Sequence, residues 1–279
     1  MEKKLVFLDI DGTILPSEGG IHPAVKEALK KARAKGHRIF ICTGRSCHML
    51  PEELADVELD GIVASAGSDI WIDGENVYRE SLSAECLKET VGILDQLETI
   101  YILEGFQDVY VSKRGERILS ESEPIPGDNP EIIRWKNFFN GRKNARSIDT
   151  WVKEQAPVPK ISFIAWSRQE VERIFQVFEK TFHVVLFPAR SEDFFNGELI
   201  SRRANKGTAI HKTAEYLKMD IKDTIAFGDS MNDYQMLEEA ACGVLMGNGD
   251  EKMKDMADRV CETVEEDGVA KELARMGLC

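Results

Sequence analysis

The sequence lacks the features that mark membrane proteins, secreted disulfide proteins and zinc proteins. No apolar run approaches the roughly 20 residues of a membrane-spanning helix, and the amino terminus has no signal-peptide pattern. The six cysteines include no CxxC pair, and the five histidines show no metal-ligand spacing. We therefore expect a cytoplasmic protein with reduced thiols and no membrane partner.

Positive charge is also scarce in this chain. It has 36 lysine and arginine residues against 49 aspartate and glutamate residues, a net charge of −13. Non-specific binding to nucleic acid or to an anionic membrane needs a basic surface, so we expect neither partner. A small anionic substrate is compatible with this composition, because a metal ion or one lysine can outweigh distant acidic groups.

Several common catalytic signatures are absent. The chain has no P-loop, no GxSxG nucleophile elbow and no HExxH zinc motif. Its 279 residues are nevertheless enough for one large domain or two ordinary ones, with a sizeable core. Any chemistry must come from residues that are dispersed in the sequence and brought together by folding.

Two aspartates stand at the end of the first predicted strand. Apolar residues 5–8 predict a strand buried on both faces, followed by Asp9, Asp11 and a glycine turn at Gly12. In an open α/β sheet, ligands bind beyond the carboxyl ends of the strands, where these aspartates fall. Two carboxylates this close repel each other unless a cation lies between them, so we expect a metal site here.

Alternating strand and helix patterns predict an α/β fold. Strands over residues 5–8 and 38–42 flank a helix that begins at Pro23, and such a βαβ unit implies a parallel sheet. From about residue 83 the pattern becomes α+β, and strand-helix alternation resumes with a short strand over residues 198–201. We predict a Rossmann-like doubly wound parallel sheet core formed by residues 1–82 and 190–279, with an α+β domain of residues 83–189 inserted in it.

Polar residues fall at the carboxyl ends of core strands or at the start of a core helix. They are Asp9 with Asp11, Thr43, Lys206, and Asp229 with Asp233. Acidic side chains with a lysine and a threonine meet the needs of phosphoryl transfer, in which cations neutralise charge on the transferring group. Mg²⁺ prefers oxygen ligands and keeps several waters, so two or three carboxylates suffice to bind it. We therefore expect Mg²⁺ as the cofactor.

The segments around these residues resemble the four motifs of the haloacid dehalogenase (HAD) superfamily. They are Asp9-Ile10-Asp11-Gly12-Thr13, Cys42-Thr43-Gly44-Arg45, Asn205-Lys206-Gly207 and Gly228-Asp229-Ser230-Met231-Asn232-Asp233. The long gap between Thr43 and Lys206 is similar to that of the Cof-type subgroup, which inserts a large α/β cap between the second and third motifs. The inserted segment is accordingly expected to be the cap that determines substrate specificity.

The resemblance implies a covalent mechanism through an aspartyl-phosphate intermediate. Asp9 would be the nucleophile, and Asp11 would be the general acid and base. Mg²⁺ would be bound by a side-chain oxygen of Asp9, the backbone carbonyl of Asp11, and Asp229. Asp233 would be a more distant or water-mediated metal partner, and it could also N-cap the helix that begins at Tyr234.

The resemblance also implies a set of residues that bind the phosphoryl oxygens. They are Thr43, Gly44, Arg45, Lys206 and Asn232. Arg45 has two interpretations, either contact with the substrate or an ion pair with an acidic neighbour. The subgroup usually carries an Asn-Gly-Ala turn after the third strand, and Ser65-Ala66-Gly67-Ser68 replaces it here. This replacement removes an amide that could orient the turn or meet the substrate.

These features together predict a Mg²⁺-dependent phosphatase that hydrolyses a small phosphorylated metabolite such as a sugar phosphate. The cap would close over the site and exclude bulk water. Two alternatives stay open: a phosphotransferase or phosphomutase that uses the same intermediate, and a non-catalytic protein that binds a phosphorylated ligand. We expect a monomer or a small homo-oligomer.

Overall fold

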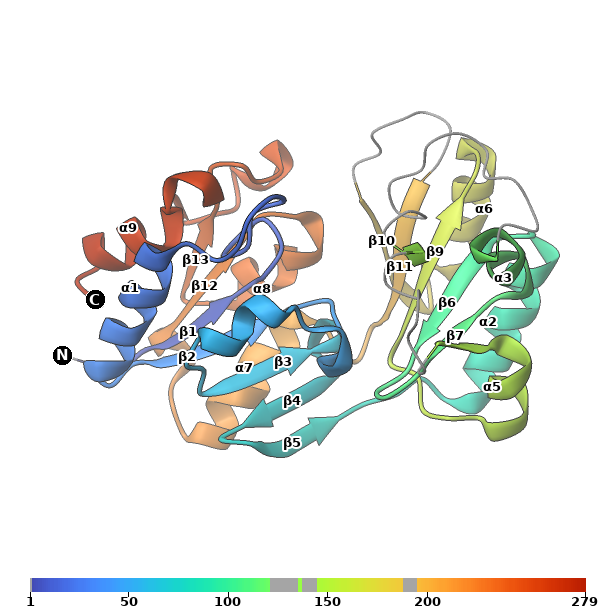
Figure 1. Ribbon diagram of the computed structural model, residues 1–279, viewed down its shortest axis with the longest axis horizontal. Helices are drawn as coiled ribbons and strands as arrows, with labels where there is room; N and C mark the ends of the chain where they lie inside the picture. Colours follow the sequence, from blue (N-terminus) through green and yellow to red (C-terminus); the bar gives the residue numbers. More distant parts are fainter. Residues whose placement is uncertain (1, 121–134, 137–144, 188–194) are drawn as a thin grey trace. The chain divides into compact units, whose positions relative to one another are not determined.

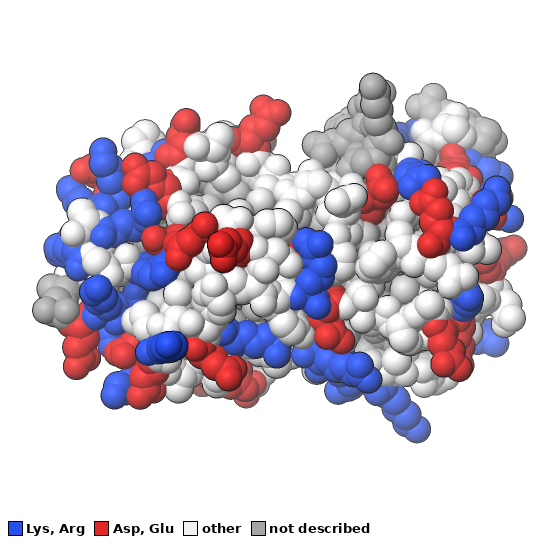
Figure 2. All heavy atoms as spheres, turned by 90° about the horizontal axis from the view of Figure 1, so that it is seen from below, with Lys and Arg blue, Asp and Glu red and all other residues white. Residues whose placement is uncertain are grey.

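The computed structural model describes residues 2–120, 135–136, 145–187 and 195–279. These residues form two compact units, drawn in Figure 1: Met1–Glu80 with Arg203–Cys279, and Ser81–Arg202. On the face drawn in Figure 2, basic and acidic side chains of the described residues lie intermixed. No helix in the described part of the chain is both long and apolar enough to cross a membrane.

An eight-stranded sheet forms the centre of the first unit, in the order β14-β13-β12-β1-β2-β3-β4-β5. The strands are β1 (Leu5–Leu8), β2 (Arg38–Cys42), β3 (Gly61–Ala64), β4 (Asp69–Ile72), β5 (Glu75–Arg79), β12 (Thr224–Gly228), β13 (Cys242–Leu245) and β14 (Arg259–Val260). The strands from β14 to β3 are parallel, whereas β4 and β5 add an antiparallel hairpin. The carboxyl ends of β1, β2 and β12 therefore meet at one edge of the sheet.

Helices cover both faces of this sheet. Helices α1 (Pro23–Ala34) and α9 (Gly268–Arg275) pack together on one face, and α7 (Lys206–Leu217) and α8 (Tyr234–Glu239) on the other (Figure 1). Strand β1 contributes to both cores, because Val6 and Leu8 pack with α1 while Leu5 and Phe7 pack with α7. This two-sided burial explains why every residue of the strand is apolar. The predicted doubly wound α/β core is confirmed.

The sequence before α7 fixes where this helix begins. Asn205 Oδ1 accepts a hydrogen bond from Thr208 N at 2.9 Å, and Thr208 Oγ1 accepts one from Asn205 N at 3.0 Å. This reciprocal pair is a capping box. Ile210 and Ala214 pack on the sheet side of the same helix. The capping box and this apolar face together hold Lys206 in the first turn of α7.

The second unit contains a six-stranded sheet in the order β10-β11-β9-β6-β7-β8. Its strands are β6 (Ile100–Glu104), β7 (Val109–Val111), β8 (Ala145–Ser147), β9 (Lys160–Ala165), β10 (Phe182–Leu186) and β11 (Phe195–Ser201). Its helices include α2 (Ala84–Gln96), α3 (Lys113–Leu119), α5 (Ile148–Glu154) and α6 (Arg168–Phe178). Neighbouring strands are antiparallel except β7 and β8, which are parallel. The unit has an apolar core of its own, which includes Tyr101, Trp151 and Phe163.

The structure places the carboxyl-terminal end of the inserted segment later than the sequence suggested. The strand expected at residues 198–201 is part of β11, which pairs with β9 and β10 of the second unit. Because β11 satisfies its backbone hydrogen bonds in that sheet, the second unit extends to Arg202. The expected boundary between residues 189 and 190 lies outside the described residues. The apolar pattern of a strand does not show which of two sheets will accept it.

Candidate active site

The predicted site residues come from elements that meet at one edge of the parallel sheet. Asp9 directly follows β1, Thr43 follows β2, and Asp229 follows β12. Strand β1 pairs with both β2 and β12, so these side chains start from neighbouring strand ends. Lys206 reaches the same edge from the first turn of α7.

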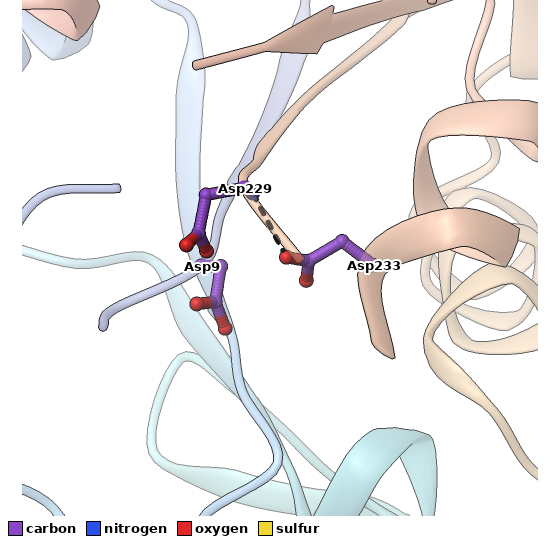
Figure 3. Close-up of side chains that lie close together, drawn as sticks. All are labelled: Asp9, Asp229 and Asp233. Carbon is purple, nitrogen blue, oxygen red and sulfur yellow. Dashed lines mark hydrogen bonds between the residues drawn. The ribbon is translucent and has the colours of Figure 1, made fainter. Parts of the chain in front are cut away.

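Three carboxylates lie close together at this edge. Asp9, Asp229 and Asp233 each place one oxygen within 4.8 Å of the other two (Figure 3). Asp9 is 4% exposed and Asp233 is 0% exposed. Buried carboxylates at this separation repel one another, so the cluster requires neighbouring positive charge.

Part of that positive charge comes from Lys206, whose side chain is fully buried. Its Nζ donates hydrogen bonds to Asp9 Oδ1 at 2.6 Å and to Asp233 Oδ1 at 2.5 Å. Burial alone would lower the pKa of Lys206, but Asp233 and Asp9 raise that pKa above its ordinary value. Lys206 is therefore an ammonium group shared between two carboxylates, and it cannot neutralise a third.

Asp233 organises the loop after β12 through its second oxygen. Asp233 Oδ2 accepts hydrogen bonds from Asp229 N at 3.0 Å and Ser230 N at 3.1 Å. Asp233 directly precedes Tyr234, yet its side chain makes no capping hydrogen bond to the described helix α8. Asp233 stands at the N-cap position that the sequence allowed, but its side chain does not cap the helix, because the carboxylate turns back toward Lys206 and the loop amides instead.

Burial and mutual repulsion raise the pKa values of two members of the cluster. Burial, followed by Asp233, raises the pKa of Asp9 from 3.8 to about 7, although Lys206 opposes the rise. Burial, followed by Asp233 and Asp9, raises the pKa of Asp229 from 3.8 to about 8. Without further positive charge, both groups would hold protons near neutral pH. A cation beside them would restore the ionised carboxylates.

The oxygens of this cluster fit a hard divalent cation. Among the described residues, Asp229 Oδ1 is buried and accepts no hydrogen bond. Burying such an oxygen costs free energy unless a ligand satisfies it. Gly12 leaves space for this carboxylate, since a Cβ atom at Gly12 would lie 2.3 Å from Asp229 Oδ2. Clustered carboxylate oxygens are the ligands that divalent magnesium and calcium prefer.

Asp11 faces a different partner. Arg45 Nε donates to Asp11 Oδ2 at 2.8 Å, and Arg45 Nη2 donates to Asp11 Oδ1 at 2.7 Å. Thr43 Oγ1 accepts a hydrogen bond from Arg45 N at 3.2 Å, which ties the predicted phosphate-binding segment together. Of the two interpretations of Arg45, the structure contains the ion pair with an acidic neighbour. Its contact with substrate stays a prediction.

The comparison with known proteins decides the family. Residues 6–273 match the haloacid dehalogenase-like hydrolases. The chain belongs to this family. The match spans both units and confirms the predicted superfamily, its Cof-type subgroup and the class of enzyme at the level of hydrolases.

Named relatives of this hydrolase cover almost its whole length. The putative phosphatase YkrA of Bacillus subtilis is 26% identical over 280 residues, which cover 100% of this chain and 99% of YkrA. The 5-amino-6-(5-phospho-D-ribitylamino)uracil phosphatase YitU of Bacillus subtilis is 30% identical over 289 residues, or 98% of each chain. The structure of BT4131, a sugar phosphatase of HAD subclass IIB, superimposes with a TM-score of 0.80 at 23% identity. That match covers 99% of this chain and 100% of BT4131, and it shows the same fold.

The turn Ser65-Ala66-Gly67-Ser68 after β3, none of whose residues was predicted as a site residue, also belongs to the hydrolase site. Ser65 and Ala66 have φ angles of 50° and 54°, a left-handed conformation that costs energy in residues with a Cβ atom. Ser65 N donates to Arg45 O at 2.8 Å, and Ala66 N donates to Thr43 O at 3.0 Å. The turn therefore holds the backbone of the segment that carries Thr43 and Arg45.

The same turn contacts the start of α7. Gly67 has a φ angle of 100°, and a Cβ atom there would lie 2.2 Å from the carbonyl oxygen of Asn205. Asn205 caps α7 and immediately precedes Lys206. The turn thus touches two separate parts of the site. The sequence signal that could have revealed it was the departure from the subgroup's usual Asn-Gly-Ala turn.

Gly44 and Asn232 lie on loops at the same edge. Gly44 stands between Thr43 and Arg45 in the segment after β2. Asn232 lies in the short 3-10 turn Met231–Asp233, where its Oδ1 accepts a hydrogen bond from Ser230 Oγ at 2.8 Å. Phosphate binding by either residue stays a prediction.

Proposed function

We propose that this hydrolase is a Mg²⁺-dependent phosphatase that releases inorganic phosphate from a small phosphorylated metabolite such as a sugar phosphate. The observation that carries the proposal is the buried contact of Asp9 with Lys206, next to the carboxylate of Asp229. A carboxylate nucleophile needs neighbouring positive charge to stay ionised and to approach an anionic phosphoryl group. Relatives that are phosphatases, and a sugar phosphatase with the same fold, support this substrate class.

In the proposed reaction, an oxygen of Asp9 attacks phosphorus while the bond from phosphorus to the leaving oxygen breaks, which forms an aspartyl-phosphate. Asp11 donates a proton to the leaving oxygen. It then accepts a proton from the water that attacks the aspartyl-phosphate. This second attack breaks the bond between phosphorus and Asp9, so phosphate leaves and both aspartates return to their initial states.

Side-chain oxygens of Asp9 and Asp229, with the backbone carbonyl of Asp11, would hold Mg²⁺. Bound there, Mg²⁺ supplies positive charge that lowers the pKa of Asp9 and offsets the charge of the phosphoryl oxygens. We assign Asp233 a positioning role, because its carboxylate already accepts hydrogen bonds from Lys206 and two backbone amides. It orients Lys206 and the loop that carries Asp229.

The remaining polar groups at this edge would bind the phosphoryl oxygens. Thr43, Gly44 and Asn232 lie on the loops after β2 and β12, and Lys206 lies at the amino terminus of α7, where backbone amides favour an anion. We further propose that the second unit acts as the cap, which would exclude water and read the leaving group.

An assay with para-nitrophenyl phosphate and a panel of phosphorylated metabolites, with Mg²⁺ and with EDTA, tests this function. We expect Mg²⁺-dependent release of phosphate that is lost in Asp9→Asn and slowed roughly 10²–10⁴-fold in Asp11→Asn. Acid quenching during turnover should trap a phosphorylated protein in the wild type but not in Asp9→Asn. Activity that survives Asp9→Asn, or that EDTA leaves unchanged, would contradict the mechanism.

The same assay separates the alternatives. Product analysis in the presence of an added alcohol detects phosphotransfer, because phosphate then appears on the alcohol instead of as the free ion. Binding of phosphorylated ligands without any turnover would indicate a non-catalytic binding protein.

A further inference from the structure

Arg45 binds both carboxylate oxygens of Asp11. The two hydrogen bonds measure 2.8 Å and 2.7 Å, a paired geometry that fixes the orientation of the carboxylate. Arg45 is itself held at two further points, because its Nη1 donates to Met49 O at 3.3 Å and its backbone N donates to Thr43 Oγ1 at 3.2 Å. The guanidinium group thus has a defined position beside the predicted phosphate-binding segment.

This ion pair lies apart from the buried acidic cluster. Asp11 is in the turn after β1 and Arg45 in the turn after β2, and these strands are parallel neighbours. The side chains are 53% exposed for Asp11 and 29% exposed for Arg45, whereas Lys206 is buried and shared between two carboxylates. Arg45 is therefore a cation that an anionic ligand can reach from solvent.

The paired geometry prevents Asp11 from acting on a leaving group. While both of its oxygens accept hydrogen bonds from Arg45, neither can present a proton to another oxygen. Asp11 must first release at least one oxygen from Arg45 and take up a proton from solvent, to which its side chain is exposed, before it can donate that proton. A phosphoryl group offers the guanidinium the same spacing of oxygens with more negative charge, so it can replace the carboxylate.

We propose that Arg45 is a positioning residue that exchanges partners: it binds Asp11 in the free enzyme and a phosphoryl oxygen in the substrate complex. The exchange frees Asp11 at the moment when a leaving group is in place. This inference rests on the proposed phosphatase function, because it assumes that the phosphoryl group binds at the Asp9 edge. It makes Asp11 and the ligand competitors for one guanidinium group.

Competition has a consequence for equilibrium binding, which does not depend on turnover. Replacing Asp11 by asparagine weakens its hold on Arg45, so inorganic phosphate should bind more tightly to Asp11→Asn than to the wild type. We expect roughly a 5-fold gain, the size of releasing one partly exposed ion pair. In an Arg45→Met background, Asp11→Asn should change phosphate affinity by less than about 2-fold, because nothing remains to compete for.

The experiment is a double-mutant cycle on the full chain with saturating Mg²⁺, in which calorimetry measures the affinity for inorganic phosphate. An equal gain from Asp11→Asn in both backgrounds would show simple charge repulsion and overturn the exchange. No gain in either background would show a purely structural ion pair and overturn it as well. Arg45→Lys, which keeps the charge but loses the paired geometry, serves as a second background in case Arg45→Met does not fold.

Failure of the exchange and failure of the proposed function give different results. The phosphatase function alone would be refuted if the mutant cycle showed the expected coupling between Arg45 and Asp11 in phosphate binding but the wild type turned over no phosphorylated compound. A wild type that is an active phosphatase but shows no coupling between Arg45 and Asp11 would refute the exchange alone.

Discussion

Without a bound metal, this enzyme should lose stability as the pH rises toward neutrality. The pKa of Asp9 rises from 3.8 to about 7 and that of Asp229 from 3.8 to about 8. In this range the native state holds protons that the unfolded chain has already released. These two groups therefore contribute most to the free energy of unfolding of the metal-free protein below pH 3.8. Their contribution falls as the pH rises to about 8.

The size of the effect follows from Asp9, which is almost fully buried. A shift of one pKa unit corresponds to about 1.4 kcal/mol, so the rise in the pKa of Asp9 from 3.8 to about 7 corresponds to about 4 kcal/mol. Asp229 acts in the same direction. Saturating Mg²⁺ should remove or reverse this dependence, because a bound cation favours the ionised carboxylates and displaces their protons.

Urea unfolding at a series of pH values, in EDTA and in Mg²⁺, measures this effect. Asp9→Asn is the matched control, because asparagine has nearly the same shape but does not ionise. The difference between wild type and variant removes the titration of groups that do not interact with Asp9, and it retains the part of the Asp229 shift that Asp9 causes. We expect the metal-free wild type to lose stability relative to Asp9→Asn as the pH rises. Parallel pH profiles in EDTA, or a relative gain by the wild type, would refute the reasoning.

Two further substitutions test how the site is supported. Gly67→Ala places a Cβ atom against the backbone of Asn205 and should lower the free energy of unfolding by about 1–3 kcal/mol and reduce kcat. Gly74→Ala, with a similar positive φ but nothing within 4 Å, is its control and should lose only about 1 kcal/mol and no activity; equal losses would exclude the contact as the cause. Lys206→Met leaves two buried carboxylates without their counter-charge and should cost about 3–5 kcal/mol in urea unfolding and abolish phosphate release. Lys222 forms an exposed ion pair with Asp220, so Lys222→Met should hardly change the free energy of unfolding. A similar loss of stability in Lys206→Met and Lys222→Met would contradict the role assigned to Lys206.

The sequence predicted which residues would meet, because that depends on strand ends. Residues 5–8 and 225–227 are apolar runs that are followed within two residues by Asp9 and Asp229, and parallel pairing brings the ends of such strands to one edge. The convergence of Asp9 and Asp229 therefore follows from local patterns combined with one rule of sheet topology. The same reasoning predicted the strand before Thr43.

The sequence did not predict which way the side chains would turn. Asp233 stands where an N-cap would stand, but a buried ammonium group and two loop amides offer its carboxylate stronger partners than the helix does. Arg45 could equally have pointed toward an open phosphate site. Its choice of Asp11 depends on the relative position of two turns that are far apart in the sequence. The same limit applied to β11, whose sheet partner is decided by tertiary contacts.

The charges at this edge favour an order of events. Four aspartates and two cations of the described residues lie at this edge: Arg45 pairs with Asp11, Lys206 pairs with Asp9 and Asp233, and Asp229 lies next to the second group. When all are ionised, two negative charges remain uncompensated, and a dianionic phosphoryl group would be repelled. A divalent cation bound first would cancel that excess, restore Asp9 as a nucleophile and leave Arg45 as the group that can still change partners. Substrate binding should therefore depend on prior metal binding. The ion pair with Arg45 prevents Asp11 from donating a proton until the phosphoryl group arrives.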